Sequence, residues 1–276
     1  MHALTIRGRC TRRPIVAPGG PVVSLTSFDP RVRLVHLTIE SIARGQSLPS
    51  RVVLWLDELD HVAFPLPALR RLQRRGLEIR HCEDLGPHKK YQPYVASIEH
   101  HEVPMVTADD DVLYPRRWLS SLAEAHALHP DAVLAHRVNR IRVEDGAIRP
   151  YTEWGRADDA RPTPRNYAVG VKGILYPPRF LDQLRDAGTD FRTQAPGSSD
   201  TWLHHMSLRH GVRTLPVFAL RTRAVVPMRG GPKAPALMDE NVDRGRNDRV
   251  RAAVLAPDEV AAIVADDFAP QARSNQ

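Results

Sequence analysis

The chain has 276 residues, 42% of them hydrophobic and 26% charged, which is typical of a globular protein large enough to bury a sizeable core. Its two cysteines, Cys10 and Cys82, form no Cys-x-x-Cys pair or Cys/His cluster, which argues against a disulfide framework and a structural zinc site. The formal net charge of +7 favours anionic partners, but the basic residues are mixed with carboxylates and form no nucleic-acid-binding motif, so we expect no nucleic acid partner.

The sequence contains no run of about 18 or more apolar residues, and its first residues lack the apolar middle region of a signal peptide. Together with the scarcity of cysteine, this favours a cytoplasmic protein. Peripheral association with the inner face of the membrane stays open as an alternative.

The first part of the chain alternates between strand and helix patterns. After a loose lead-in over residues 1–20, with room for a short strand at 4–6, the pattern predicts strands at 22–27, 51–56 and 77–81 and helices at about 32–42 and 67–75. Gly45 and Gly76 follow the two helices, as expected of helix ends. This order, with short connections, predicts right-handed parallel units of a nucleotide-binding α/β type.

The pattern continues less regularly after His81. We expect helices at 89–100, 116–129 and 257–266, a helix that starts near Ser199, and strands at 103–108, 131–135, 170–178 and 212–218. The segments 149–166 and 221–248 are polar and rich in Gly and Pro, so we predict long loops there.

Three consecutive carboxylates, Asp109, Asp110 and Asp111, follow the predicted strand 103–108. Adjacent anions repel one another, so something positive should bring them together unless they are simply solvated. Ligands of open α/β sheets bind at the carboxyl ends of strands, and Mg²⁺ and Mn²⁺ prefer carboxylate oxygens. A divalent metal site is the functional interpretation, and a solvated acidic turn is the alternative.

Several segments in this order carry a family resemblance. They are Thr26-Ser27-Phe28, Asp57 after the second strand, His88-Lys89-Lys90-Tyr91, Thr107-Ala-Asp-Asp-Asp-Val-Leu-Tyr-Pro115, Gly173-Ile-Leu-Tyr176-Pro-Pro178 and Ser199-Asp200-Thr-Trp202. Together they resemble nucleotide-sugar-dependent glycosyltransferases of the GT-A fold, nearest to the bacterial family-2-like enzymes of capsular and other surface polysaccharide biosynthesis. The resemblance covers roughly residues 21–250.

The resemblance implies a Rossmann-like α/β fold, with a mostly parallel central sheet flanked by helices and a C-terminal acceptor-side portion. We therefore predict a flexible lead-in over 1–20, a single GT-A domain over 21–250 and a C-terminal helix and tail over 251–276. Within the domain, 21–138 would form the nucleotide-sugar half and 139–250 the acceptor half.

The resemblance also implies donor-side roles, in which the DxD carboxylates act through Mn²⁺ or Mg²⁺. Asp109 and Asp111 are the predicted metal ligands, with Asp111 the first choice, and Asp109 and Asp110 would also contact the nucleotide sugar. The remaining predicted nucleotide-sugar contacts are Thr26, Ser27, Asp57, Lys89 and Lys90. For Asp57, a helix cap or turn carboxylate is an equal alternative, and one of the two lysines is expected to point outward.

On the acceptor side, the family places a carboxylate pair before a Trp-containing helix, and one member acts as general base. Here Ser199 takes the first position, so Asp200 is the predicted base, with a helix N-cap as the alternative. The predicted acceptor-binding residues are Gly173, Tyr176 and Trp202, and Trp202 could equally be a core anchor. Weaker candidates are a late metal-binding histidine (His204, His205 or His210) and a clamp over the diphosphate at Asn247-Asp248.

The sequence thus predicts a metal-dependent, inverting glycosyltransferase that moves a sugar from a nucleoside-diphosphate sugar to a saccharide or glycolipid acceptor. A nucleotidyltransferase that makes sugar nucleotides is one alternative, but those enzymes usually carry a Gly-rich basic loop where this chain has Thr26-Ser-Phe-Asp-Pro30. A sugar- or nucleotide-binding protein of the same fold without turnover is the other alternative, suggested by Ser199.

Overall fold

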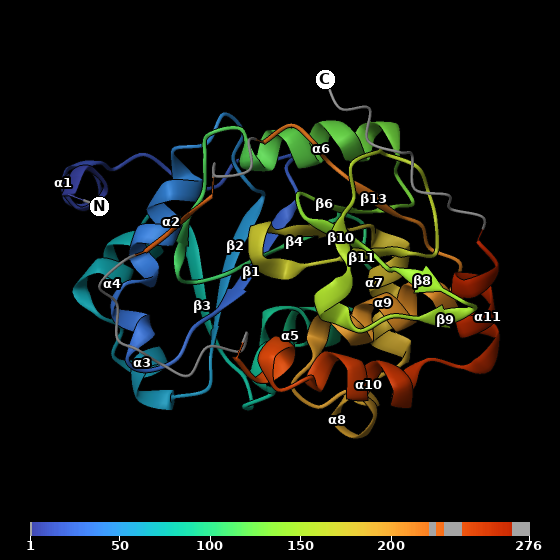
Figure 1. The fold of residues 1–276 in the computed structure, drawn as a ribbon. Helices are drawn as coiled ribbons and strands as arrows, with labels where there is room; N and C mark the ends of the chain where they lie inside the picture. The colour runs from blue at the N-terminus through green and yellow to red at the C-terminus, as the bar shows by residue number, and fades with distance from the viewer. Residues whose placement is uncertain (1, 221–224, 229–238, 267–276) are drawn as a thin grey trace.

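A computed structural model describes residues 2–220, 225–228 and 239–266 (Figure 1). Its centre is a seven-stranded sheet in the order β13-β6-β12-β4-β1-β2-β3. All neighbouring strands are parallel except β12, which runs antiparallel to both β4 and β6. The predicted α/β class with a mostly parallel sheet is therefore confirmed. The strands are β1 (Val22–Thr26), β2 (Arg51–Leu56), β3 (Leu77–His81), β4 (Met105–Ala108), β6 (Val133–Ala135), β12 (Ile174–Tyr176) and β13 (Thr214–Pro216).

Helices cover both faces of this sheet because the strand residues alternate between two buried clusters. Val23 and Leu25 of β1 pack with one set of helices, whereas Val22 packs with the other. The first set is α2 (Val35–Ala43), α4 (Pro67–Gln73) and α6 (Trp118–Leu128), and the second is α5 (Gln92–Ala96), α7 (Pro178–Asp186), α9 (Ser199–Arg209) and α10 (Arg246–Val254) (Figure 1). The result is a three-layer arrangement.

Smaller elements surround these layers. Short pairs join β5 (Val112–Leu113) to β14 (Val226–Pro227) and β8 (Val143–Glu144) to β9 (Ala147–Ile148), and β7 (Val138–Arg140) lies between β10 (Gly155–Arg156) and β11 (Asn166–Ala168). The other helices are α3 (Leu59–Ala63), α8 (Phe191–Gln194) and α11 (Pro257–Ala265). The 3₁₀ turns are η1 (Arg31–Arg33), η2 (Gly86–Lys90), η3 (Tyr151–Glu153) and η4 (Gly170–Lys172), and η5 (Asp239–Asp243) is π-helical.

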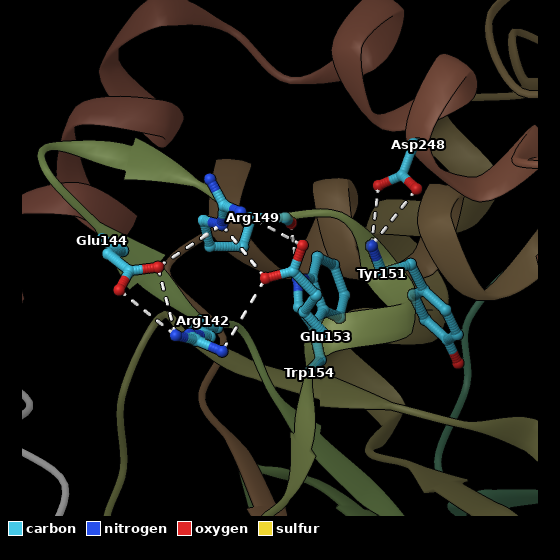
Figure 2. Close-up of polar contacts among 7 residues, drawn as sticks. All are labelled: Arg142, Glu144, Arg149, Tyr151, Glu153, Trp154 and Asp248. Atoms are coloured by element: carbon cyan, nitrogen blue, oxygen red, sulfur yellow. Dashed lines mark hydrogen bonds and ion pairs between the residues drawn. The ribbon is translucent and has the colours of Figure 1, made fainter.

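Ion pairs hold the segment 142–153, whose last part begins the predicted loop 149–166 and contains η3. Arg142 and Arg149 lie between Glu144 and Glu153 in a network of ion pairs, with Arg149 Nε 3.1 Å from a carboxylate oxygen of Glu153 (Figure 2). Several of these side chains are well exposed, so each pair contributes little by itself. The network therefore holds the segment in one conformation and adds little to the free energy of unfolding.

Two local predictions differ from the structure. Residues 2–10 form a helix, α1 (His2–Cys10), rather than a short strand at 4–6, and Leu4 is buried there because α1 packs on α2 and α4. The helix predicted over 89–100 is shorter, since α5 spans only Gln92–Ala96. The chain leaves the helix there, and His101 binds Asp182 of α7 at 2.6 Å. Of the predicted loop 221–248, the parts 221–224 and 229–238 lie outside the described residues.

No helix within the described ranges is long and apolar enough to cross a membrane.

Candidate functional site

The site forms where the strand order reverses. From β1 the sheet continues to β2 and β3 on one side and to β4 on the other, and ligands of open α/β sheets bind at the carboxyl ends of strands at such a reversal. Ser27 follows β1 and Asp110 follows β4, and the Ser27 hydroxyl donates a 2.6 Å hydrogen bond to Asp110 Oδ2. Two predicted nucleotide-sugar residues that are 83 positions apart therefore meet at this reversal of strand order.

The three carboxylates of the triplet lie in different surroundings. The side chain of Asp110 is 7% exposed and that of Asp111 is 54% exposed. Arg31 of η1 contacts both, with Nη2 2.6 Å from Asp111 Oδ2. Burial raises the pKa of Asp110 to about 6, although Arg31 and the Ser27 hydroxyl act in the opposite direction. Part of the positive charge that the triplet requires is therefore supplied by the chain itself.

The backbone of the triplet is also held firmly. The Thr38 hydroxyl of α2 lies 2.9 Å from the Asp110 carbonyl oxygen and 2.8 Å from that of Val112. The Asp109 N–H donates to the Tyr114 hydroxyl at 2.8 Å, and Tyr114 is fully buried. The backbone of the triplet is therefore fixed by the core on the α2 side of the sheet.

Lys90 connects the triplet to the predicted base. Its Nζ lies 3.1 Å from Asp109 Oδ1, and its side chain is only 14% exposed. Burial alone would lower the pKa of Lys90, but the charges of Asp109 and Asp200 raise it. A Cβ added at Gly170 would lie 2.8 Å from Lys90 Nζ and 3.2 Å from Asp200 Oδ1, so both groups pass close to this glycine. Asp109, Lys90 and Asp200 thus form one charged group.

Asp200 does not cap its helix. Ser198 occupies the N-cap position of α9, and Asp200 lies in the first turn, where its Oδ2 accepts the Gly170 N–H at 3.0 Å. Burial raises the pKa of Asp200, and the Lys90 ammonium and the Gly170 N–H oppose that rise. An unusually basic carboxylate beside a cation is suited to accept a proton.

The remaining predicted donor-side residues are engaged within the protein. Lys89 Nζ lies 2.7 Å from Asp57 Oδ2 and 3.2 Å from Asp84 Oδ1, so two predicted contacts of the nucleotide sugar bind each other. The Thr26 hydroxyl donates to the Trp55 carbonyl oxygen at 2.9 Å. Thr26 and Asp57 lie at the ends of β1 and β2, and Lys89 lies in η2. The contact of these residues with a nucleotide stays a prediction.

His88 has a structural role. Its ring stacks on Phe191 at 4.2 Å, and its two nitrogens lie 2.9 Å from the Tyr91 hydroxyl and 3.0 Å from the Ala195 carbonyl oxygen. Burial lowers its pKa to about 4. His88 therefore anchors the turn that carries Lys89 and Lys90.

The predicted acceptor residues are less open than the sequence suggests. Gly173 has a φ of +90°, and an added Cβ would lie 2.7 Å from the Trp118 indole nitrogen, so its small size admits Trp118. Tyr176 and Trp202 are each 2% exposed, and Trp202 packs beside Phe191 and His205. In this conformation neither ring offers a face to a sugar, and the acceptor roles of the three residues stay predictions.

The carboxylates of the triplet suit a divalent ion that a substrate phosphate also binds. Within the described part of the chain, no group of three or more His, Cys, Asp or Glu side chains could hold a metal by itself. An ion bound together with substrate phosphates needs only one or two carboxylates, because waters complete its shell. Asp109 and Asp111 provide such hard oxygen donors at the open end of β4. The residues therefore fit an ion shared with a diphosphate and do not fit an all-protein cage.

Three of the late candidates, His205, Asn247 and Asp248, bind other parts of the protein. His205 Nδ1 lies 2.8 Å from Glu259 of α11 and joins the two helices, and burial lowers the pKa of His204 to about 3. Asp248 accepts the Tyr151 N–H at 3.0 Å, which connects α10 to η3 (Figure 2). Asn247 Oδ1 accepts the Ser198 hydroxyl at 3.0 Å. In this structure both members of the predicted diphosphate clamp hold α10 in place.

The sequence did not reveal three neighbours of the site: Arg31 beside Asp110 and Asp111, and Gly170 and Tyr151 near Asp200. Arg31 could have been found, because it follows β1 and the triplet needs a cation at the same edge of the sheet. Gly170 had no such signal, since Gly173 in the same segment appeared equally suitable. Burial, together with the charge of Asp200, raises the pKa of Tyr151 to about 12.

Comparisons with known proteins complete the description. No protein-family model matches the sequence, and no curated protein matches it either. Among solved structures, GalNAc-T7 with UDP, GalNAc and Mn²⁺ aligns over 79% of this chain with a TM-score of 0.51 and 11% identity. The fold is of the GT-A type. This chain spans about half of GalNAc-T7, since the alignment covers 47% of that chain.

Two further solved structures are similar at TM-scores below 0.5. The mannosyltransferase PcManGT from Pyrobaculum calidifontis, in complex with GDP-Man and Mn²⁺, has a TM-score of 0.49 and 16% identity over 96% of this chain and 82% of its own. TarS residues 1–349 from S. aureus have a TM-score of 0.46 and 15% identity over 70% of this chain and 57% of that chain.

Proposed function

We propose that this protein is a metal-dependent, inverting glycosyltransferase that moves a sugar from a nucleoside-diphosphate sugar to a saccharide or glycolipid acceptor. The observation that carries the proposal is the charged group of Asp109, Lys90 and Asp200. It brings the end of β4 and the start of α9 together at the reversal of strand order. The GT-A fold, and the UDP and Mn²⁺ that GalNAc-T7 holds, agree with this assignment.

The residues divide into two tasks. Asp109 and Asp111 would hold Mn²⁺ or Mg²⁺ together with the diphosphate, and the ion would stabilise the charge that develops on the leaving group. Asp200 would take the proton of the acceptor hydroxyl while the oxygen of that hydroxyl attacks the anomeric carbon of the donor sugar. The bond from the anomeric carbon to the diphosphate breaks in the same step. Lys90 favours the anionic form of Asp200, which is the form that can accept a proton.

Turnover of nucleoside-diphosphate sugars, screened with Mn²⁺ and saccharide acceptors, tests this function. Asp200→Asn should lower turnover about 10²- to 10⁴-fold, the usual contribution of a general base, while nucleoside diphosphates still bind. Asp186→Asn is the matched control because Asp186 is an exposed aspartate paired with Arg185. Full turnover by Asp200→Asn would remove the base assignment, and formation of sugar nucleotides from nucleoside triphosphates would indicate a nucleotidyltransferase.

A further inference from the structure

A second feature lies at the opposite edge of the sheet from the triplet. It is a groove of about 690 Å³, lined by residues from segment 13–17, the end of α2 and the turn that follows it, and Arg116 ahead of α6. Segment 13–17 precedes β1, and residues 43–48 precede β2, so the groove lies at the amino ends of these strands. We call it the arginine groove, because Arg13, Arg44 and Arg116 line it and no carboxylate does.

The walls of the arginine groove are fixed by backbone hydrogen bonds. The Gln46 N–H donates to the Arg116 carbonyl oxygen at 2.8 Å, which joins the turn after α2 to the start of α6. The Ala17 N–H donates to the Pro49 carbonyl oxygen at 2.9 Å and joins the lead-in to the same turn. The groove is therefore formed before any ligand arrives.

Its three arginines have no anionic partner among the residues that the structure describes. No described carboxylate lies within 4.0 Å of Arg13, Arg44 or Arg116, whereas the neighbouring Arg117 pairs with Glu124 at 3.2 Å. The Nε atom of Arg44 is buried and has no hydrogen-bond partner. A buried N–H without an acceptor is unfavourable, and an oxygen of a ligand would satisfy it.

We infer that the arginine groove binds the phosphate group of an anionic phosphate ester. A guanidinium presents its donors in a planar fork that matches phosphate oxygens, and three of them around one hollow favour a multiply charged anion. The volume lies within the range of small-molecule sites, so there is room for more than a bare phosphate. A phosphorylated small molecule and a lipid headgroup share this chemistry.

The inference does not depend on the proposed glycosyl transfer. None of Asp109, Asp111, Lys90 and Asp200 lines the arginine groove. Failure at one site therefore leaves the other untouched. Because a nucleoside diphosphate is itself a phosphate ester, only the part of its binding that depends on Mn²⁺ and on Asp111 reports on the triplet.

The test measures binding of the full chain to two probes. One is vesicles of phosphatidylglycerol in phosphatidylcholine, followed by co-sedimentation, and the other is glycerol 3-phosphate, followed by calorimetry. Arg44→Gln combined with Arg116→Gln should weaken binding at least about tenfold, because two charge-assisted phosphate contacts are lost. Arg74→Gln combined with Arg117→Gln removes the same charge outside the groove and should bind as the wild type does.

The outcomes are distinct. Binding to vesicles alone identifies a lipid headgroup, and binding to glycerol 3-phosphate identifies a soluble ester; either supports the site when only the groove variant loses it. Binding to neither probe, or equal losses in both double variants, overturns the inference. Arg116→Gln alone removes an exposed side chain and keeps the test valid if the Arg44 variant does not fold.

Discussion

The two ends of the parallel strands, called here the carboxyl edge and the amino edge of the sheet, differ in how their charged side chains are paired. At the carboxyl edge the acids have cationic partners, since Arg31 binds Asp110 and Asp111 and Lys90 binds Asp109. At the amino edge, three arginines line the arginine groove, and no described carboxylate lies beside them. At the triplet, a bound ligand or metal ion would replace an existing ion-pair partner of the carboxylates. In the arginine groove, an anionic ligand could pair with the arginines without replacing a partner. The predictions below test each half of this contrast.

The largest effect is expected from His88, which anchors the lysines of the carboxyl edge. A histidine in an unfolded chain has a pKa near 6.5, and burial lowers that of His88 to about 4. The unfolded state therefore binds more protons between these values, so the free energy of unfolding should fall as pH drops from 6.5 to 4, by on the order of 3 kcal/mol.

Denaturant unfolding across this pH range measures the effect. His88→Gln should lose that share of the pH dependence, and the difference from wild type isolates it from the other buried histidines. His81→Gln, at an exposed position, is the control. A pH profile of His88→Gln parallel to that of the wild type would show that His88 does not carry the effect.

Arg31→Gln tests whether the chain supplies the cation of the triplet. The variant leaves Asp110 buried without its ion-pair partner, so it should destabilise the protein by about 2 kcal/mol. Mn²⁺ should raise the melting temperature of the variant more than that of the wild type, because Arg31 no longer shares Asp111. Arg33→Gln is the control, since Arg33 is 70% exposed and lies 3.7 Å from Asp29. Equal metal effects in the three proteins would contradict the account.

Gly170→Ala tests the approach of Lys90 to Asp200. The added Cβ would meet the Lys90 ammonium at 2.8 Å and push the end of this flexible side chain aside. Turnover should fall about tenfold, because a small displacement of a positioned group is enough to slow catalysis. Gly155→Ala is the matched control, as nothing lies within 4 Å of its added Cβ. Unchanged turnover by Gly170→Ala would show that this contact is not needed.

The sheet could be predicted because its pattern is local. The runs at 22–27 and 51–56 are short and mostly apolar, and the run at 77–81 alternates apolar with polar residues; each of them forms a strand. The helix α1 could not be predicted in the same way, since among its described side chains only Leu4 is buried and the packing on α2 and α4 comes from distant sequence. Tertiary contact decided that segment, not local propensity.

The parts of the site that are formed by consecutive residues could be predicted from the sequence. The triplet is visible in the sequence, and the convergence of Ser27 with Asp110 follows from parallel strands that share an edge. The pairing of Lys89 with Asp57 was not predicted, because both residues were expected to contact the nucleotide sugar. Glycines and arginines gain their roles from the atoms that lie next to them in space, as Gly170 and Arg31 do.

The most direct test of the central claim is the affinity for nucleoside diphosphates with and without Mn²⁺, measured for the wild type, Asp111→Ala and Asp131→Ala. Asp131 is an exposed aspartate outside the site and serves as the control. We predict that Mn²⁺ raises the affinity of the wild type and of Asp131→Ala about tenfold or more, and that Asp111→Ala loses this coupling. Equal affinity of the wild type with and without Mn²⁺, or a full metal effect in Asp111→Ala, would contradict a donor site built on the triplet.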